Sequence, residues 1–361
     1  MKHPKVTIKT FSLRELASDS GVDVGKLRAF QKNPFAASGE TIAKIVGCSE
    51  GEEAGREFVF PLHVRGACGE IEVLAGSSLF VSQKYRRSGL GMDLPELRWQ
   101  YSPSKVALGA SLSQMALPVH QLLDYSVFLL PRYIMLWKSR AVVEMKLHGL
   151  LSKTIGFIAD CGIGIYASLL KVMALIALIG IKVDEVCPDD DKTLAVVAKL
   201  IENDKALFSE VHDARWLKWH MTESFSKDGP LRLFVAKRKN EIIGFYMDKK
   251  RFHETASHRG FKNVWLGSIM EWQMKSGFCK KLKWLLVRAA LTLKAEGVDA
   301  VEIPSADRNL HCFFRRIGWR CIGESNFVIK AGEGSSLFEN EAMKIVDNWR
   351  LRPAMGDAGM S

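Results

Sequence analysis

The sequence predicts a mixed α+β fold built from two similar units, and three observations support this. A length of 361 residues suffices for two domains of about 150 residues each. Hydrophobic residues make up 47% of the chain and charged residues 25%, values that exclude a disordered, collagen-like or multi-span membrane protein. The order helix, strands, long helix, strand, helix, strand recurs in each half, which indicates a tandem duplication of one α+β unit with little sequence identity remaining.

In the first half, alternation of apolar and polar residues predicts a strand over 6–11, and short helical patterns follow over 12–30. Three runs rich in Ile, Val and Phe, separated by Gly, Ser and Glu, then predict an antiparallel meander. These strands span 41–48, 57–64 and 70–81. A glycine loop over 83–91, a short helix over 92–99, a strand over 106–116, a helix after Pro118 and strands over 127–136 and 142–146 complete this half.

The most apolar stretch, 155–181, carries only Asp160 and Lys171 as charges. Its longest uncharged run at the end, 172–181, is half the length of about twenty residues that a spanning helix needs. Glycines at 156, 162 and 164 weaken a continuous helix. We therefore expect a buried interdomain helix or helical pair, with a peripheral membrane contact and a membrane span as alternatives.

The second half opens with a polar linker over 183–192, where three aspartates at 189–191 suit a helix N-terminus; a metal site there is the alternative. Helices are expected up to about 223. Later elements are strands 231–237, 241–249 and 264–272, helix 280–296, strand 300–304, helix 307–317 and strand 320–330. The expected domains are 1–150 and 191–332, joined by the apolar segment and linker 151–190 and followed by a tail, 333–361.

The charge balance predicts a negatively charged partner. Lysine and arginine total 51 against 40 aspartates and glutamates, a net charge of +11, which suits phosphate-bearing cofactors, nucleic acid and anionic lipid. Because the basic residues are spread through both halves, no specific nucleic-acid partner is expected. Seven cysteines without a C-x-x-C pair argue against disulfides and zinc, so we predict no metal. The N-terminus lacks the apolar region of a signal peptide, which favours a cytoplasmic protein.

One motif carries chemistry: Arg86-x-x-Gly89-x-Gly91 follows a predicted strand and opens a predicted helix. Glycines let backbone N–H groups crowd around an anion, and a helix N-terminus adds partial positive charge. Lys84 and Arg87 add formal charge. The pattern is neither the dinucleotide fingerprint nor the P-loop. It predicts a pyrophosphate site.

This motif and its preceding strand resemble the GNAT superfamily of acyl-CoA N-acyltransferases, most clearly over residues 5–148. The resemblance implies that the loop Arg86, Arg87, Ser88, Gly89, Leu90 and Gly91 holds the CoA pyrophosphate. It also implies that the strand through Phe80 and Val81 follows the pantetheine arm, that a backbone N–H there polarises the thioester carbonyl, and that the strand after it splays away to open an acyl slot. The second half resembles the fold loosely and lacks the signature, since Met274 and Cys279 stand where Arg and Gly are expected.

Candidates for proton transfer are less well marked. Glu70 and Glu72 lie on the strand that leads into the loop and face the same side, so they are the candidate bases, although a solvated strand face gives the same pattern. The family often uses a tyrosine as acid four residues before a Gly-Phe pair. Here that position is Leu123, and the nearby Tyr125 is the candidate acid, with a packing role as the alternative.

The resulting prediction is a tandem GNAT-type enzyme that transfers an acyl group from acetyl-CoA, or another acyl-CoA, to a small-molecule amine acceptor. Two alternatives remain open at this point. A tandem GNAT-like aminoacyl transferase would take its donor from charged tRNA, and a non-catalytic protein would keep the fold to bind or sense CoA.

Overall fold

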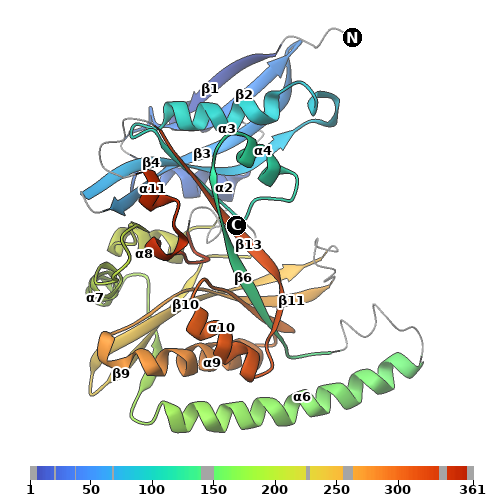
Figure 1. The fold of residues 1–361 in the computed structure, drawn as a ribbon, viewed down its shortest axis with the longest axis vertical. Coiled ribbons are helices and arrows are strands. Elements are labelled where there is room, and N and C mark those ends of the chain that lie inside the picture. Colours follow the sequence, from blue (N-terminus) through green and yellow to red (C-terminus); the bar gives the residue numbers. More distant parts are fainter. Residues whose placement is uncertain are drawn as a thin grey trace. The chain divides into compact units, whose positions relative to one another are not determined.

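We describe the protein from a computed structural model that covers residues 6–19, 22–36, 38–66, 69–139, 150–224, 228–254, 263–332 and 340–355. The fold is mixed α/β, as predicted (Figure 1). It divides into two compact units that interleave along the chain. Unit 1 comprises residues 1–130, 202–227 and 325–361, and unit 2 comprises 131–201 and 228–324.

Unit 1 is a sheet in the order β1-β2-β3-β4-β5-β13, with β8 paired to β3. All pairs are antiparallel except β4 with β5, which is parallel. Its strands are β1 (Thr7–Ser12), β2 (Ile42–Ser49), β3 (Glu52–Gly66), β4 (Gly69–Val81), β5 (Val106–Ala110), β8 (Ser209–Glu210) and the end of β13 (Arg320–Ala331). Its helices are α1 (Leu13–Leu16), α2 (Val24–Gln31), α3 (Leu90–Tyr101), α4 (Ala116–Leu122), α8 (Ala214–Thr222) and α11 (Asn340–Met343), with short 3-10 helices η1 (Gln83–Tyr85) and η3 (Val346–Asn348).

Unit 2 repeats this plan in the order β6-β12-β11-β10-β9-β7, again with one parallel pair, β11 with β12. Its strands are the end of β6 (Ser126–Leu136), β7 (Lys182–Glu185), β9 (Arg232–Arg238), β10 (Glu241–His253), β11 (Val264–Met274) and β12 (Ala300–Pro304). Its helices are α6 (Leu150–Ala177), α7 (Asp191–Glu202), α9 (Cys279–Ala295) and α10 (Arg308–Arg316), with the 3-10 helix η2 (Ser276–Phe278).

The two units exchange their closing strands. In unit 2, β12 pairs with residues 132–136 of β6, a strand that begins in unit 1. In unit 1, β5 pairs with residues 327–331 of β13, a strand that begins in unit 2. The units therefore differ from the expected contiguous domains 1–150 and 191–332, because each sheet is completed by a strand from the other half of the sequence.

In unit 1, strand alternation sends neighbouring side chains to opposite faces of the sheet. Val59 packs with Leu90 and Leu94 of α3 on one face. On the other face, Phe60 contacts Phe30 of α2 and Trp219 of α8. Helices thus cover both faces of β3, and Leu79 and Val81 of β4, the strand that precedes the motif, pack against the same cluster as α3.

Both units carry a β-bulge at the same place, which supports the predicted duplication. In unit 1, β4 pairs with β5 through Gly76, and the β3–β4 register then shifts around Ser78. In unit 2, β11 pairs with β12 through Ser268, and the β10–β11 register shifts at Met270. In each strand the bulge comes two residues after the last parallel pair. This shared detail is preserved although the sequences of the two strands differ.

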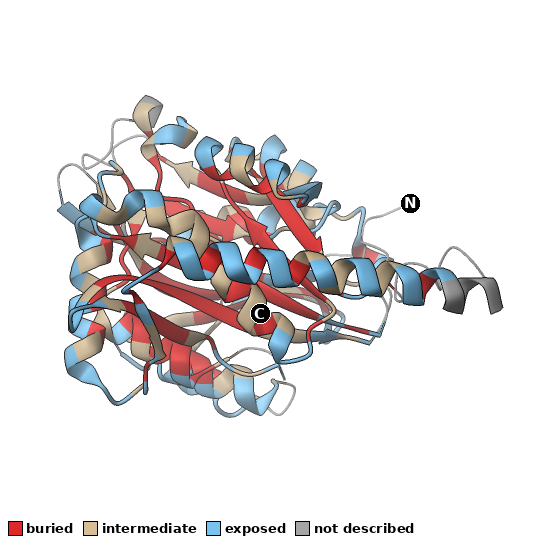
Figure 2. Ribbon diagram, turned by 90° about the horizontal axis from the view of Figure 1, so that it is seen from below, coloured by how far each residue is buried: buried red, intermediate tan, exposed pale blue. Residues whose placement is uncertain are grey.

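The apolar segment differs from the expectation of a buried helix. It forms one continuous helix, α6, and only 17% of the span Ile155–Ala177 is buried; Figure 2 shows exposed positions along its length. The glycines at 156, 162 and 164 do not interrupt it, because packing of one face on α9 outweighs their low helix propensity. This helix is long and apolar enough to cross a membrane by length and composition.

The rest of the second half follows the predicted elements closely, with strands β7 and β8 in addition. The predicted linker contains strand β7. Asp190 accepts a hydrogen bond from the Thr193 amide at 3.1 Å, so the aspartates begin helix α7 as expected. No group of side chains suited to a metal occurs among the described residues. The strand expected over 142–146 lies outside the described residues.

Candidate functional site

The Arg86–Gly91 motif connects the end of β4 to the start of α3, where the sequence placed it. Gly89 caps the helix with φ +89°, a left-handed conformation that favours glycine. Leu90 is buried and fills the space left by two glycines, since a Cβ at Gly47 or Gly55 would lie within 3 Å of it. The Ser88 hydroxyl donates to the Tyr85 carbonyl at 2.8 Å. These contacts hold the backbone of the loop in a defined conformation.

Alternate amides of this loop are available to a ligand. The amides of Ser88 and Leu90 donate within the loop, to the Tyr85 carbonyl and to the Ser88 hydroxyl. Among the described residues, those of Arg87, Gly89 and Gly91 have no hydrogen-bond acceptor. Three unpaired N–H groups at a helix N-terminus form an anion-binding concavity. The exposed side chains of Arg86 and Arg87 add positive charge beside it.

A bulge deforms β4 just before the loop. Arg56 of β3 lies opposite Phe80 and Phe58 lies opposite Ser77, so two residues of β4 have no partner in this register. One of them, Ser78, has φ +55°. The Ser78 hydroxyl accepts a hydrogen bond from Lys26 Nζ at 2.8 Å. Bulges re-aim the backbone groups next to them, and this one lies immediately before Phe80 and Val81.

Beyond Gly76, strand β5 diverges from β4. The parallel pairing covers only Leu74–Gly76, and the chain after β5 is held by Asn326 of β13. The Ser111 amide donates to the Asn326 carbonyl at 2.8 Å, and the Leu112 amide donates to the Asn326 side chain at 2.7 Å. The Asn326 side-chain amide donates back to the Leu112 carbonyl at 3.1 Å. These bonds account for the splay that the family resemblance implied.

A cavity of about 230 Å³ occupies the gap opened by this splay. Its walls come from the end of β4, the motif and the segment before and within α4. The lining residues are Leu79, Phe80, Val81, Arg86, Gly91, Ser113, Met115, Ala116 and Val119. Four of the eight residues predicted for cofactor binding therefore meet in one place, whereas the α4 side was not expected. The lining is largely apolar, with Arg86 as its charged side chain.

The structure does not bring Glu70 and Glu72 to this cavity, so they are not placed as bases. Both lie at the opposite end of β4, eight to ten residues before Phe80, and a strand of that length spans about 30 Å. Glu70 instead pairs with Arg65 across the hairpin at 2.7 Å. Alternate residues of a strand share a face, but most of the length of β4 separates Glu70 and Glu72 from Phe80.

Tyr125 is buried in a polar cluster rather than open to the cavity. Its hydroxyl donates to the Pro95 carbonyl at 2.9 Å and accepts from Arg98 Nη2 at 3.2 Å. Burial raises the Tyr125 pKa to about 12, and Arg98 also pairs with the buried Glu57 and lies 3.3 Å from His120 Nε2. These contacts are the ones expected for the packing role that the sequence offered as the alternative to an acid.

The corresponding loop of unit 2 is built differently. After β11 the chain forms the 3-10 helix η2 and enters α9, whose cap residue Phe278 provides no side-chain hydrogen bond. Its sequence lacks the arginine and second glycine of the motif. The bulge is therefore common to both units, whereas the glycine loop with its two arginines is a feature of unit 1.

Comparison with known proteins gives a result at the level of structure. No family model matches the sequence, and no curated protein matches it. A GCN5-related N-acetyltransferase from Anabaena variabilis ATCC 29413 superposes with TM-score 0.55 at 9% identity, covering 90% of this chain and 72% of that one. Saccharomyces cerevisiae N-myristoyltransferase with bound myristoyl-CoA superposes with TM-score 0.55 at 10% identity, covering 90% and 82%.

A protein from Enterococcus faecalis V583, described as a probable N-acyltransferase, superposes with TM-score 0.52 at 10% identity, covering 91% of this chain and 72% of that one. At such identities the likeness concerns the fold, and it agrees with the bulged strand, the splay and the motif. The chain has the GNAT fold.

Proposed function

We propose that this protein transfers an acyl group from an acyl-CoA thioester to an amine. One observation carries the proposal: the loop that holds the unpaired amides reaches the cavity through Arg86 and Gly91, and the bulged end of β4 lines the same cavity. An anion site beside an exposed strand edge and an apolar slot suits a ligand with a pyrophosphate, an amide-bearing arm and an acyl end. Acyl-CoA has these three parts in that order.

The residues present fit this ligand. The amides of Arg87, Gly89 and Gly91 and the side chains of Arg86 and Arg87 would hold the pyrophosphate. The edge of β4 beyond Gly76 would pair with the amides of the pantetheine arm, as a strand edge pairs with an added peptide. Apolar side chains around the cavity would receive the acyl group.

In the reaction, the amine nitrogen attacks the thioester carbon, the new C–N bond replaces the C–S bond, and the amine loses one proton as the thiol is released. Backbone N–H groups re-aimed by the bulge at Ser78 would donate to the carbonyl oxygen as it gains negative charge. Lys26, on α2, holds the Ser78 hydroxyl and is proposed as a positioning residue for this backbone.

The size of the cavity favours a short acyl group. Its volume of about 230 Å³ is below the range of about 300–1,000 Å³ that is usual for ligand pockets. We therefore propose acetyl-CoA as the first donor to test and small-molecule amines as acceptors. We also propose a cytoplasmic setting for the reaction, which the cysteine usage of the sequence supports.

The test combines binding with turnover. Acyl-CoAs of increasing chain length are titrated calorimetrically, and thiol release is then followed with a panel of amines. Binding together with amine-dependent thiol release supports the proposal. A folded protein that binds none of the acyl-CoAs would refute it and favour a tRNA-dependent transferase. Binding without amine-dependent release would refute catalysis and leave a CoA-binding protein.

A further inference from the structure

Helix α6 presents an apolar face that no described residue of unit 2 covers. Ten of its residues, or of the turn that follows it, have large apolar side chains that are between 42% and 74% exposed. They are Ile155, Phe157, Ile158, Ile165, Leu169, Val172, Met173, Leu175, Ile176 and Ile179. Ile158, Ile165, Leu169, Val172 and Ile176 follow the spacing of one helix face. A continuous exposed face of this kind marks an interaction site.

The opposite face of α6 is already occupied. Leu170, Ala174 and Leu178 are buried in the unit 2 core, and Lys281 of α9 donates to the Ala177 carbonyl at the end of the helix. Asp160 is also directed inward, because it accepts hydrogen bonds from the Ser139 amide at 2.6 Å and hydroxyl at 2.8 Å. A helix held along one side by its own unit lies on a surface rather than crossing a membrane.

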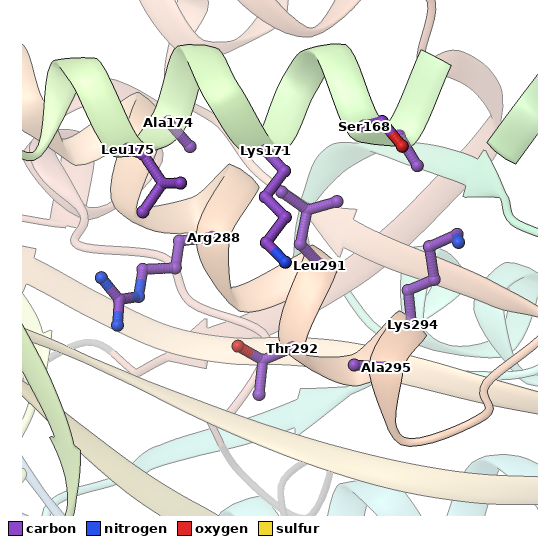
Figure 3. Close-up of a pocket in the computed structure, with 10 residues that line it drawn as sticks. Ser168, Lys171, Ala174, Leu175, Arg288, Leu291, Thr292, Lys294 and Ala295 are labelled. Atoms are coloured by element: carbon purple, nitrogen blue, oxygen red, sulfur yellow. The ribbon is translucent and has the colours of Figure 1, made fainter. Parts of the chain in front are cut away.

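A cationic pocket borders the apolar face. It has a volume of about 500 Å³ and lies between α6 and α9. Figure 3 shows Lys171 extending from α6 toward α9, with Arg288 and Lys294 on α9 around the same hollow. Lys171 and Arg288 have no ion pair or hydrogen bond with any residue that the structure describes. Helix α9 carries five cations and no carboxylate over its whole length.

We propose that α6 docks unit 2 onto an anionic lipid bilayer, with its apolar face in the acyl-chain boundary and a lipid phosphate in the pocket of Lys171 and Arg288. An amphipathic surface of this kind binds through buried apolar area together with attraction to anionic headgroups. Charge decides between a bilayer and a second copy of the chain. Pairing two α6 faces would bring two cationic pockets together, whereas anionic headgroups neutralise them.

This proposal is independent of acyl transfer and is tested by vesicle flotation of the intact protein. The probes are vesicles of phosphatidylcholine alone and vesicles that also contain about one third phosphatidylglycerol. We expect binding to the anionic vesicles. Lys171→Ala with Arg288→Ala should weaken that binding about 25-fold, because each cation near an anionic surface contributes about fivefold. Lys192→Ala with Lys199→Ala, on α7, removes the same charge and should leave it unchanged.

The apolar face is tested by Leu169→Glu with Ile176→Glu, which should abolish flotation, whereas the exposed Leu122→Glu in unit 1 should not. Circular dichroism and the melting temperature check that each variant is folded. The proposal is overturned if the intact protein floats with neither vesicle, or if both charge variants weaken binding equally. Release from vesicles only by detergent would show a spanning helix. Self-association without flotation, abolished by Leu169→Glu with Ile176→Glu, would show a second copy as the occupant.

Discussion

Replacing Gly89 by glutamate is the most direct test of the proposal that the Arg86–Gly91 loop binds an anion. The substitution places a negative side chain at the helix N-terminus, between the unpaired amides of Arg87 and Gly91. It also adds backbone strain, because Gly89 has φ +89°, and a residue with a Cβ costs about 1–2 kcal/mol in that conformation. Gly297→Glu is the matched control, since Gly297 has φ +91° and open space around it in unit 2.

The expected loss of binding follows from Coulomb's law. Two unit charges about 4 Å apart repel by about 1 kcal/mol in water and about 4 kcal/mol at an effective dielectric constant of 20. Acetyl-CoA should therefore bind Gly89→Glu about 5- to 1,000-fold more weakly than the wild type in calorimetric titration. Gly297→Glu should bind with unchanged affinity although it loses similar stability. Equal affinities in Gly89→Glu and the wild type, both folded, would show that the pyrophosphate does not lie at this loop.

Four further substitutions probe the surroundings of the site. Asp93→Asn removes a carboxylate near Gly89 and should tighten acetyl-CoA binding about fivefold; weaker binding would contradict the proposed charge balance. Asn326→Ala removes the bonds that hold the chain after β5 and should raise the KM for acyl-CoA about tenfold, with an unchanged KM arguing against the cavity. Tyr125→Phe should lower the free energy of unfolding by about 1–3 kcal/mol with kcat unchanged, whereas a large loss of kcat would restore Tyr125 as the acid. Burial, reinforced by Arg98, lowers the His120 pKa from 6.5 to about 4. As pH falls, the unfolded chain therefore binds the proton before the folded protein does. The free energy of unfolding is highest above pH 6.5 and decreases as pH falls from 6.5 through 4. In urea titrations at pH 4 and pH 6.5, His120→Gln should reduce the difference in the free energy of unfolding between the two pH values by about 3 kcal/mol. An unchanged difference would refute the attribution of this pH dependence to His120.

Local patterns in the sequence were sufficient to place the motif. The glycines and arginines of 86–91 predicted an anion-binding loop between a strand and a helix, and the structure has β4, the loop and α3 in that order. Backbone conformation at Gly89 and helix formation after it depend on neighbouring residues, which a sequence pattern records. The strands and helices of the second half were predicted for the same reason.

The bulge at Ser78 and the far wall of the cavity were not predictable in this way. Ser78 has φ +55° although serine carries no signal for that conformation, so the register of β3 determines it. Asn326 lies more than 200 residues from Leu112, which it holds, and no local pattern links them. Tyr125 looked close to the site in sequence, but its hydroxyl is held by Pro95 and Arg98.

The amino-acid composition of helix α6 does not determine whether the helix is buried or exposed. An apolar segment of this length is typical both of a buried helix and of a helix that contacts lipid. Its glycines predicted interruptions, but the packing of Ala167, Leu170 and Ala174 against the unit 2 core keeps it continuous. Which face is covered depends on α9, more than 100 residues later in the chain.

The exchange of closing strands also sets when the sheet of unit 1 can be completed during synthesis of the protein. In unit 1, β5 has to pair with β13, which follows it by more than 200 residues in the sequence. At about 5–20 residues per second, a ribosome needs about 10–40 s to add that length. Until then Asn326 cannot hold the chain after β5, so the nascent protein has the anion-binding loop but an unfinished acyl slot. A messenger truncated anywhere before β13 would encode a chain without the proposed activity, even though it contains the whole motif.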